Sequence, residues 1–213
     1  MIYEGSPSTH LSGLASLMMV KLKANTRCLY LNSPAMVAGI RSYLAAAGLD
    51  VEQEIAKGRL LLSSDQSHLT NGSFEVDKML GMLKDALDQA LNDGYKALWA
   101  TGDMTWEFGN ENNLVKLLEY ECGLEELFRK HPALCGICQY HKDTLPIDVI
   151  KQALYTHEAV YINETLSTIN PYYALHESRD HQLQNVSTSQ LEDMLNRLHQ
   201  PADSADFDTI EPR

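Results

Sequence analysis

The sequence predicts an α/β fold with a mostly parallel sheet of about six strands and helices on both faces. Short apolar runs of strand length alternate with longer segments in which apolar residues recur at helical spacing, up to about residue 162. Strands and helices that alternate in this way are joined by right-handed crossovers. Such crossovers make the strands parallel and place the helices on both faces of the sheet.

The predicted strands are short and rich in aliphatic and aromatic residues. The run RCLYL at 27–31 has the length and composition of a buried strand, and YKALWAT at 95–101 is of the same kind. The complete set of predicted strands covers residues 1–4, 27–31, 59–63, 95–101, 133–140 and 159–162.

The predicted helices have apolar residues on one side and identifiable ends. Gly48 and Gly58 each follow a helix, at the position where the chain often turns left-handed. Pro146 lies near the first turn of another helix, where its missing N–H costs nothing. The complete set of predicted helices covers residues 11–23, 34–47, 51–57, 74–92, 113–130, 146–156 and 187–199.

The length and composition favour one folded domain with an appendage. The chain has 213 residues, of which 44% are hydrophobic and 22% charged, which is ordinary for a globular protein. We predict a domain over residues 1–175 and an extension over 176–213. The extension contains an amphipathic helix at 187–199 and an acidic, disordered tail.

Charge and cysteine content exclude several classes of function. The formal net charge of −12 argues against direct binding to nucleic acid or to an anionic membrane surface. No apolar run approaches the roughly 18 residues of a membrane span. The four cysteines lie mostly in apolar runs and no secretory signal is present, so we expect a protein of the reducing cytoplasm.

The segment between the first strand and the first helix has the outline of a phosphate-binding loop without its chemistry. A P-loop begins with Gly and ends in Gly-Lys-Ser/Thr. This chain offers Gly5 and Ser12 at the two ends, but His10 and Leu11 occupy the second Gly and the Lys positions. Because Leu11 carries no charge, an active phosphate loop is disfavoured. A plain strand-to-helix turn is favoured over a degenerate loop that retains weak contact with an anion or ligand.

A second candidate site follows the strand at 95–101. Ligands of parallel sheets usually bind beyond the carboxyl ends of the strands. Asp103 lies where a magnesium-binding carboxylate is found in nucleotide hydrolases, but without the partner Lys it fits better as a polar anchor in a ligand pocket. Met104 and Trp106 either line that pocket or cover the core.

The remaining titratable residues give weaker signals. Cys135 and Cys138 form a Cys-x-x-Cys motif on a strand, where residues three apart face opposite sides of the sheet. We therefore expect no bound metal ion and no other cofactor. Glu119 and Glu121 are two apart on a helix, so at most one of them points toward any given site. His157 is more often a core or capping histidine than a functional one.

Several segments together resemble the MEDS family, the sensory domain of DcmR-type prokaryotic regulators. The matching segments run in family order from residue 1 to about residue 165. They are YE at 3–4, RCLY at 27–30, AAGLD at 46–50, GRL at 58–60, GY at 94–95, TGDMTW at 101–106, LEYE at 118–121, CQY at 138–140 and TH at 156–157.

This resemblance implies a KaiC/RecA-like three-layer sandwich with a degenerate phosphate loop. It also implies sensing of a simple organic, hydrocarbon-derived molecule, coupled to signalling or transcription. The family usually carries an Asp-His pair shortly before the Tyr-Glu, at a position that lies before Met1 of this chain. Where an Asp commonly follows the Gln-Tyr, this chain has His141.

The leading functional prediction is a non-catalytic sensor of a small organic ligand. Its partner is a signalling or regulatory protein, or a second copy of the chain, docked on the apolar stripe of the helix at 187–199. Packing of that stripe on the chain's own sheet is the alternative. A KaiC-like nucleotide-binding protein with weak or no hydrolysis and a pure interaction module are the competing functions. The predicted ligand-binding residues are Tyr3, Glu4, Asp103, Met104, Trp106, Glu119, Tyr140 and His157.

Overall fold

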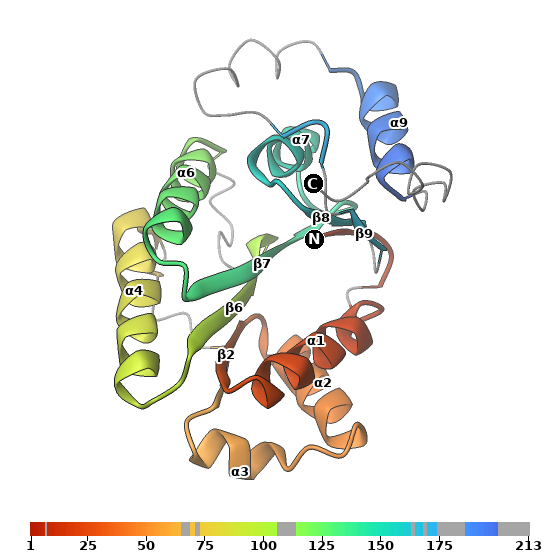
Figure 1. The fold of residues 1–213 in the computed structure, drawn as a ribbon. Coiled ribbons are helices and arrows are strands. Elements are labelled where there is room, and N and C mark those ends of the chain that lie inside the picture. Colours follow the sequence, from red (N-terminus) through yellow and green to blue (C-terminus); the bar gives the residue numbers. More distant parts are fainter. Residues whose placement is uncertain are drawn as a thin grey trace, which may run out of the picture.

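The computed structural model describes residues 1–6, 8–64, 69–70, 73–105, 114–162, 165–167, 170–173 and 186–199. A seven-stranded sheet in the order β3-β2-β6-β7-β1-β8-β9 runs through the middle of the molecule (Figure 1). Six strands are parallel, and β9 pairs antiparallel with β8 at one edge. The predicted fold class is confirmed, and the parallel α/β sheet is consistent with a RecA-like fold. The strands are β1 (Ile2–Tyr3), β2 (Thr26–Leu31), β3 (Leu60–Ser63), β6 (Ala97–Asp103), β7 (Leu134–His141), β8 (Val160–Ile162) and β9 (Thr165–Ser167).

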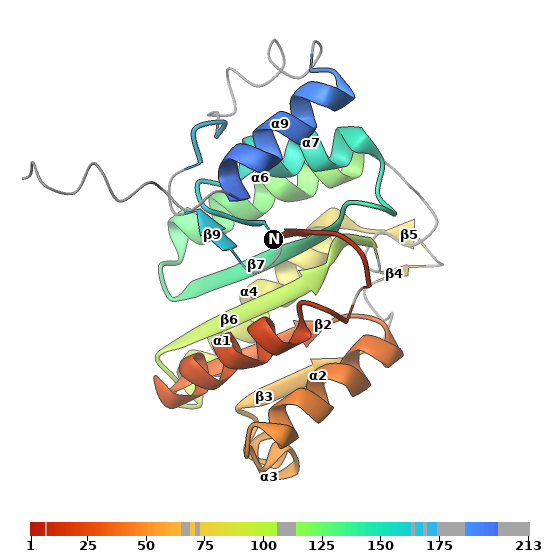
Figure 2. The same cartoon turned by 90° about the vertical axis from the view of Figure 1, so that its right-hand side faces the viewer.

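Helices cover both faces of the sheet and bury a separate apolar core on each (Figures 1 and 2). One face carries α1 (Leu11–Lys23), α2 (Pro34–Ala46) and α3 (Val51–Ala56). The other face carries α4 (Val76–Asn92), α6 (Leu114–Lys130) and α7 (Ile147–Thr156). Side chains alternate between the two cores along each strand because successive residues of a strand point to opposite faces. None of the helices described here has both the length and the apolarity that a membrane span requires.

Three short strands were not predicted from the sequence, namely β9 and a pair that precedes α4. Strands β4 (Leu69–Thr70) and β5 (Ser73–Phe74) form an antiparallel hairpin before α4, so this helix begins at Val76 instead of residue 74. The Phe74 side chain is fully buried and meets the ring of Tyr120 on α6 edge to face, at a centroid distance of 5.2 Å. The hairpin thus adds an aromatic side chain to the core beneath α4 and α6.

Helix α9 (Thr188–His199) packs on its own chain, which corrects the docking hypothesis. Its apolar stripe joins the core of the α6 face, where Leu191, Leu195 and Leu198 are at most 6% exposed. Lys142, just beyond β7, also donates a hydrogen bond of 2.9 Å to the Glu192 carboxylate on α9. The alternative prediction was that the stripe packs on the chain's own sheet. The structure agrees with it, because α9 lies against β8 and β9 (Figure 1).

Candidate functional site

A buried polar network lies at the carboxyl ends of the central strands, beneath the start of α1. The Tyr3 hydroxyl donates a hydrogen bond of 2.6 Å to the Asp103 carboxylate, and the rings of Tyr3 and His10 lie 4.0 Å apart between centroids. His10 Nε2 is 3.0 Å from Gln139 Oε1, while the Gln139 amide nitrogen donates to Thr101 Oγ1 at 2.7 Å. The structure therefore brings together Tyr3, His10 and Asp103, and these side chains contact one another and other side chains of the chain.

Burial sets the protonation of this network. It raises the pKa of Tyr3, and the nearby Asp103 carboxylate raises it further, so the phenol keeps the proton that it donates. Burial lowers the pKa of His10, which outweighs the opposing effects of Gln139 and Asp103. Because the Gln139 oxygen accepts from Nε2, the neutral ring leaves Nδ1 as a lone pair, and this atom has no partner among the described residues.

The predicted degenerate phosphate loop is occupied by contacts within the protein. The Gly5 N–H, which a phosphate loop would present to its ligand, donates instead to the Asp143 carboxylate at 2.8 Å. The Gly5 carbonyl accepts from His141 Nε2, also at 2.8 Å. Leu11, at the Lys position, is 1% exposed in the α1 core, whereas Ser12 is exposed. These contacts favour the plain strand-to-helix turn among the alternatives that the sequence left open.

Three other predicted ligand residues do not join a common pocket in the part of the chain that the structure describes. Glu4 is exposed and pairs with Lys142 at 3.0 Å. Met104 is 2% exposed in the core on the α6 face, and Glu119 is exposed on α6. Trp106 lies outside the described residues, so its predicted role stays a prediction.

The two remaining predicted residues, Tyr140 and His157, lie on the opposite face of the sheet from Tyr3. A cleft of about 590 Å³ opens there, between β7, the second half of α6 and the connection from α7 to β8. Its lining includes the apolar side chains of Leu124, Phe128 and Leu134. His157 is part of the lining, and Tyr140 is buried behind it.

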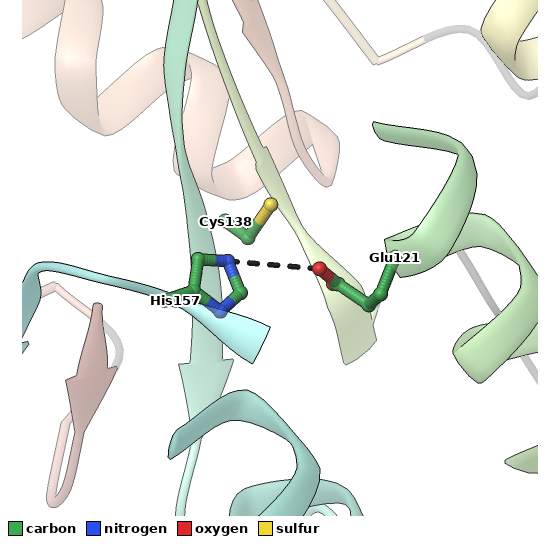
Figure 3. Close-up of side chains that lie close together, drawn as sticks. All are labelled: Glu121, Cys138 and His157. Atoms are coloured by element: carbon green, nitrogen blue, oxygen red, sulfur yellow. Dashed lines mark ion pairs between the residues drawn. The ribbon is translucent and has the colours of Figure 1, made fainter. Parts of the chain in front are cut away.

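Three potential ligand side chains from separate elements converge on this cleft. Glu121 of α6, Cys138 of β7 and His157, directly after α7, place a carboxylate oxygen, a sulfur and a ring nitrogen within 4.8 Å of one another (Figure 3). His157 Nε2 lies 3.6 Å from Glu121 Oε2. The other carboxylate oxygen, Oε1, accepts a hydrogen bond from the Tyr140 hydroxyl. Burial and the Glu121 charge raise the pKa of Tyr140 well above its usual value, so this phenol remains a donor.

The Cys-x-x-Cys motif is divided between the two faces of the sheet, as its spacing predicts. Cys138 belongs to the core on the α6 face, whereas Cys135 packs against the core on the α1 face. The two thiols are therefore not a ligand pair. Cys138 instead meets two residues, Glu121 and His157, that are distant from it in sequence.

Sequence reasoning weighed Glu121 and Cys138 but did not select them as site residues, because it expected the site beyond the carboxyl ends of the strands. The cleft is lined by Leu134, Cys135, Gly136 and Cys138 of β7 and by the residues that precede β8. One available signal was that three of the segments carrying the family resemblance, 118–121, 138–140 and 156–157, each contain a polar residue of this group. Their convergence is a tertiary contact, which spacing along the chain does not reveal.

A comparison with models of known protein families agrees with this resemblance. The family model described as MEDS, the MEthanogen/methylotroph, DcmR Sensory domain, matches residues 1–158, which include the whole group of Glu121, Cys138, Tyr140 and His157. No curated protein matches the chain at a significant level. Since the matched segment covers well over half of the sequence, the chain belongs to the MEDS family of sensory domains.

Proposed function

We propose that the chain senses a small, simple organic molecule, which binds in the cleft beside Glu121, Cys138 and His157, and that it acts without catalysis. Membership of a sensory family supports a role in prokaryotic signalling or transcription regulation. The observation that carries the proposal is the cleft itself, whose lining combines apolar side chains and the convergent polar group with charged residues such as Glu125, Arg129 and Glu158.

The size and lining of the cleft suit such a ligand. Pockets for small molecules commonly measure about 300 to 1,000 Å³ and combine apolar walls with a few placed polar groups. The cleft of about 590 Å³ lies within this range. Leu124 and Phe128 offer an apolar wall for a hydrocarbon group, and Glu121 and His157 offer polar atoms that fix its orientation.

A second groove, of about 430 Å³, runs beside β3 and offers less chemistry. Leucine side chains such as Leu29 and Leu61 dominate its lining, with Arg41 and Lys78 as its charged members. Among the described residues, its lining brings together no group of potential metal ligands like that of the first cleft. The cleft at Glu121 is therefore the stronger candidate for ligand recognition.

A nucleotide-binding function is the second candidate, and the fold is its main support. The contacts of Gly5 with Asp143 and His141 oppose it, because they use the backbone groups that would hold a phosphate. The third candidate, a pure interaction module that uses the stripe of α9, is opposed by the burial of Leu191 and Leu195 on the chain's own sheet.

A thermal-shift screen of the purified chain tests the proposal. The probes are one- and two-carbon alcohols, amines, thiols and halides, with magnesium-ATP as the competing ligand. A ligand that binds the folded state raises the melting temperature by mass action. We expect at least one organic probe to do so and Phe128→Trp, which fills the cleft, to reduce the effect. Val115→Trp, on an exposed position of the same helix, is the matched control and should retain it. A shift with magnesium-ATP alone contradicts the proposal.

A further inference from the structure

We propose that Glu121, Cys138 and His157 bind a divalent transition-metal ion of the zinc class, with one coordination position left open to the cleft. This inference rests on the cleft of the proposed function but not on its organic ligand. It reverses the expectation of a metal-free protein drawn from the sequence. That expectation rested on Cys135 and Cys138 facing opposite sides of the sheet, and the structure gives Cys138 other neighbours.

The distances within the group suit a tetrahedral ion. Bonds of about 2.0 to 2.3 Å from zinc to oxygen, nitrogen and sulfur place neighbouring ligand atoms roughly 3.3 to 3.7 Å apart. His157 Nε2 and Glu121 Oε2 already have this separation, at 3.6 Å. The sulfur of Cys138 completes a group whose atoms all lie within 4.8 Å, so side-chain adjustments of about an ångström bring the three onto one ion.

The hydrogen bonds of His157 fix the tautomer that a metal ligand needs. Its Nδ1 lies 2.9 Å from the carbonyl oxygen of Ala153, which can only accept, so in the neutral ring Nδ1 carries the proton. The lone pair of Nε2 then points toward the Glu121 carboxylate (Figure 3). Histidines that bind metals typically donate their other N–H to a carbonyl or carboxylate in this way.

Tyr140 orients the Glu121 carboxylate through a hydrogen bond. Its hydroxyl donates to Oε1 of Glu121, which leaves Oε2 directed at His157. Carboxylates that bind metals are commonly oriented by such an outer hydrogen bond. Tyr140 is therefore a positioning residue, and it does not contact the ion.

The buried carboxylate of the group, which already accepts a hydrogen bond from Tyr140, favours a cation beside it. A carboxylate, a thiol and an imidazole lone pair face one another where Glu121 is 4% and Cys138 9% exposed. Burying a carboxylate costs less when a cation neutralises its charge. A divalent ion bound by one carboxylate and one thiolate is locally neutral, and the thiol proton is released to solvent as the ion binds. A proton on His157 is the alternative cation, which leaves an ordinary ion pair with Glu121.

The ligand types select the class of metal. Sulfur and imidazole nitrogen favour zinc, cobalt or iron over magnesium or calcium, which prefer oxygen. Three protein ligands are one fewer than the four that close a structural zinc site. The remaining position faces a cleft with apolar walls, where a small molecule with a nitrogen, oxygen, sulfur or halogen atom can coordinate.

Cobalt titration of the metal-depleted full-length chain, without any organic ligand, tests the site. We expect one cobalt ion per chain, with a thiolate-to-cobalt charge-transfer band and the visible bands of a tetrahedral ion. The band should disappear in Cys138→Ser and persist in Cys135→Ser, its matched control on the same strand. Tyr140→Phe should weaken cobalt binding about tenfold. Absence of the band in the wild-type chain, or its loss in Cys135→Ser alone, overturns the proposal.

X-ray absorption spectroscopy of the zinc-loaded wild-type chain keeps the test independent of whether the variants fold. One sulfur ligand with nitrogen and oxygen neighbours supports the site, whereas no sulfur or two sulfurs contradicts it. Organic probes added to the cobalt form separate this inference from the proposed function. Cobalt binding that no probe perturbs supports the metal site and contradicts the sensory ligand. A probe that raises the melting temperature of a chain that binds no cobalt supports the sensory ligand and contradicts the metal site.

Discussion

The imidazole Nε2 of His157 lies 3.6 Å from the carboxylate Oε2 of Glu121, although one residue follows α7 and the other lies within α6. Two residues earlier on the same helix, Glu119 points to solvent. The inward side of α6 therefore carries the polar chemistry of the cleft. We therefore place ligand recognition on that side of α6 and not in the loop between β1 and α1.

The hydrogen bond from Tyr3 to Asp103 should stabilise the fold. Tyr3→Phe removes one donor from a carboxylate that is 5% exposed, and a weakened buried hydrogen bond costs about 1 to 3 kcal/mol in free energy of unfolding. Urea denaturation measures the loss. Tyr43→Phe, on an exposed position of α2, is the control and should leave the urea midpoint unchanged. Equal midpoints for the wild type and Tyr3→Phe contradict this assignment.

We expect no magnesium-dependent hydrolysis of ATP or GTP above a protein-free blank. Leu11 supplies no charge for the transferred phosphoryl group, and the Gly5 N–H is already bonded to Asp143. Phosphate release from highly purified protein is the measurement. Turnover that disappears in Asp103→Ala would establish the nucleotide-hydrolase alternative.

The buried His10 should make the fold less stable in acid. Above a pH of about 6.5 the histidine is neutral in both folded and unfolded chains, so it adds no pH dependence. Below that pH the unfolded chain takes up a proton, whereas the pKa of His10 in the folded chain is lowered by burial. The free energy of unfolding then falls as the pH falls, until the pH reaches the lowered pKa. His10→Asn should flatten this decline in urea titrations from pH 7 to about 5, and parallel profiles for the two proteins contradict it.

Helix α9 should contribute to stability and not to assembly. Leu195→Ala opens a cavity at a side chain that is 4% exposed, which costs about 2 to 5 kcal/mol in free energy of unfolding. Arg197→Ala, on the exposed side of the helix, should cost almost nothing. Denaturation measures the loss of stability, and light scattering measures the mass of the protein in solution. A lower mass in solution with unchanged stability in Leu195→Ala restores the docking hypothesis.

The sequence predicted the parallel sheet and its principal helices because those elements carry local signals. Strand runs such as 27–31 and helix ends such as Gly48 depend on neighbouring residues alone. The two-residue strands β4 and β5 are too short to give such a signal. The stripe of α9 is equally compatible with packing on a partner or on its own sheet, so its pattern alone could not place it.

The candidate site was predicted only in part, for a different reason. Tyr140 and His157 were identified, but as members of a pocket with Tyr3, which lies on the other face of the sheet. The spacing of Glu119 and Glu121 indicated that at most one of them faces a given site, without showing which. Helix α6 must be docked on β7 before Glu121 meets Tyr140, so this choice depends on tertiary structure.

The most direct test of the account compares Glu121→Gln with Glu119→Gln in the melting-temperature response to the organic probes. Both variants remove one negative charge from α6, but only Glu121 lies in the cleft. We expect at least one probe to raise the melting temperature of the wild type and of Glu119→Gln. In Glu121→Gln most of this rise should be lost. Equal rises in all three proteins, or no rise with any probe, contradict the assignment of the cleft as the sensory site.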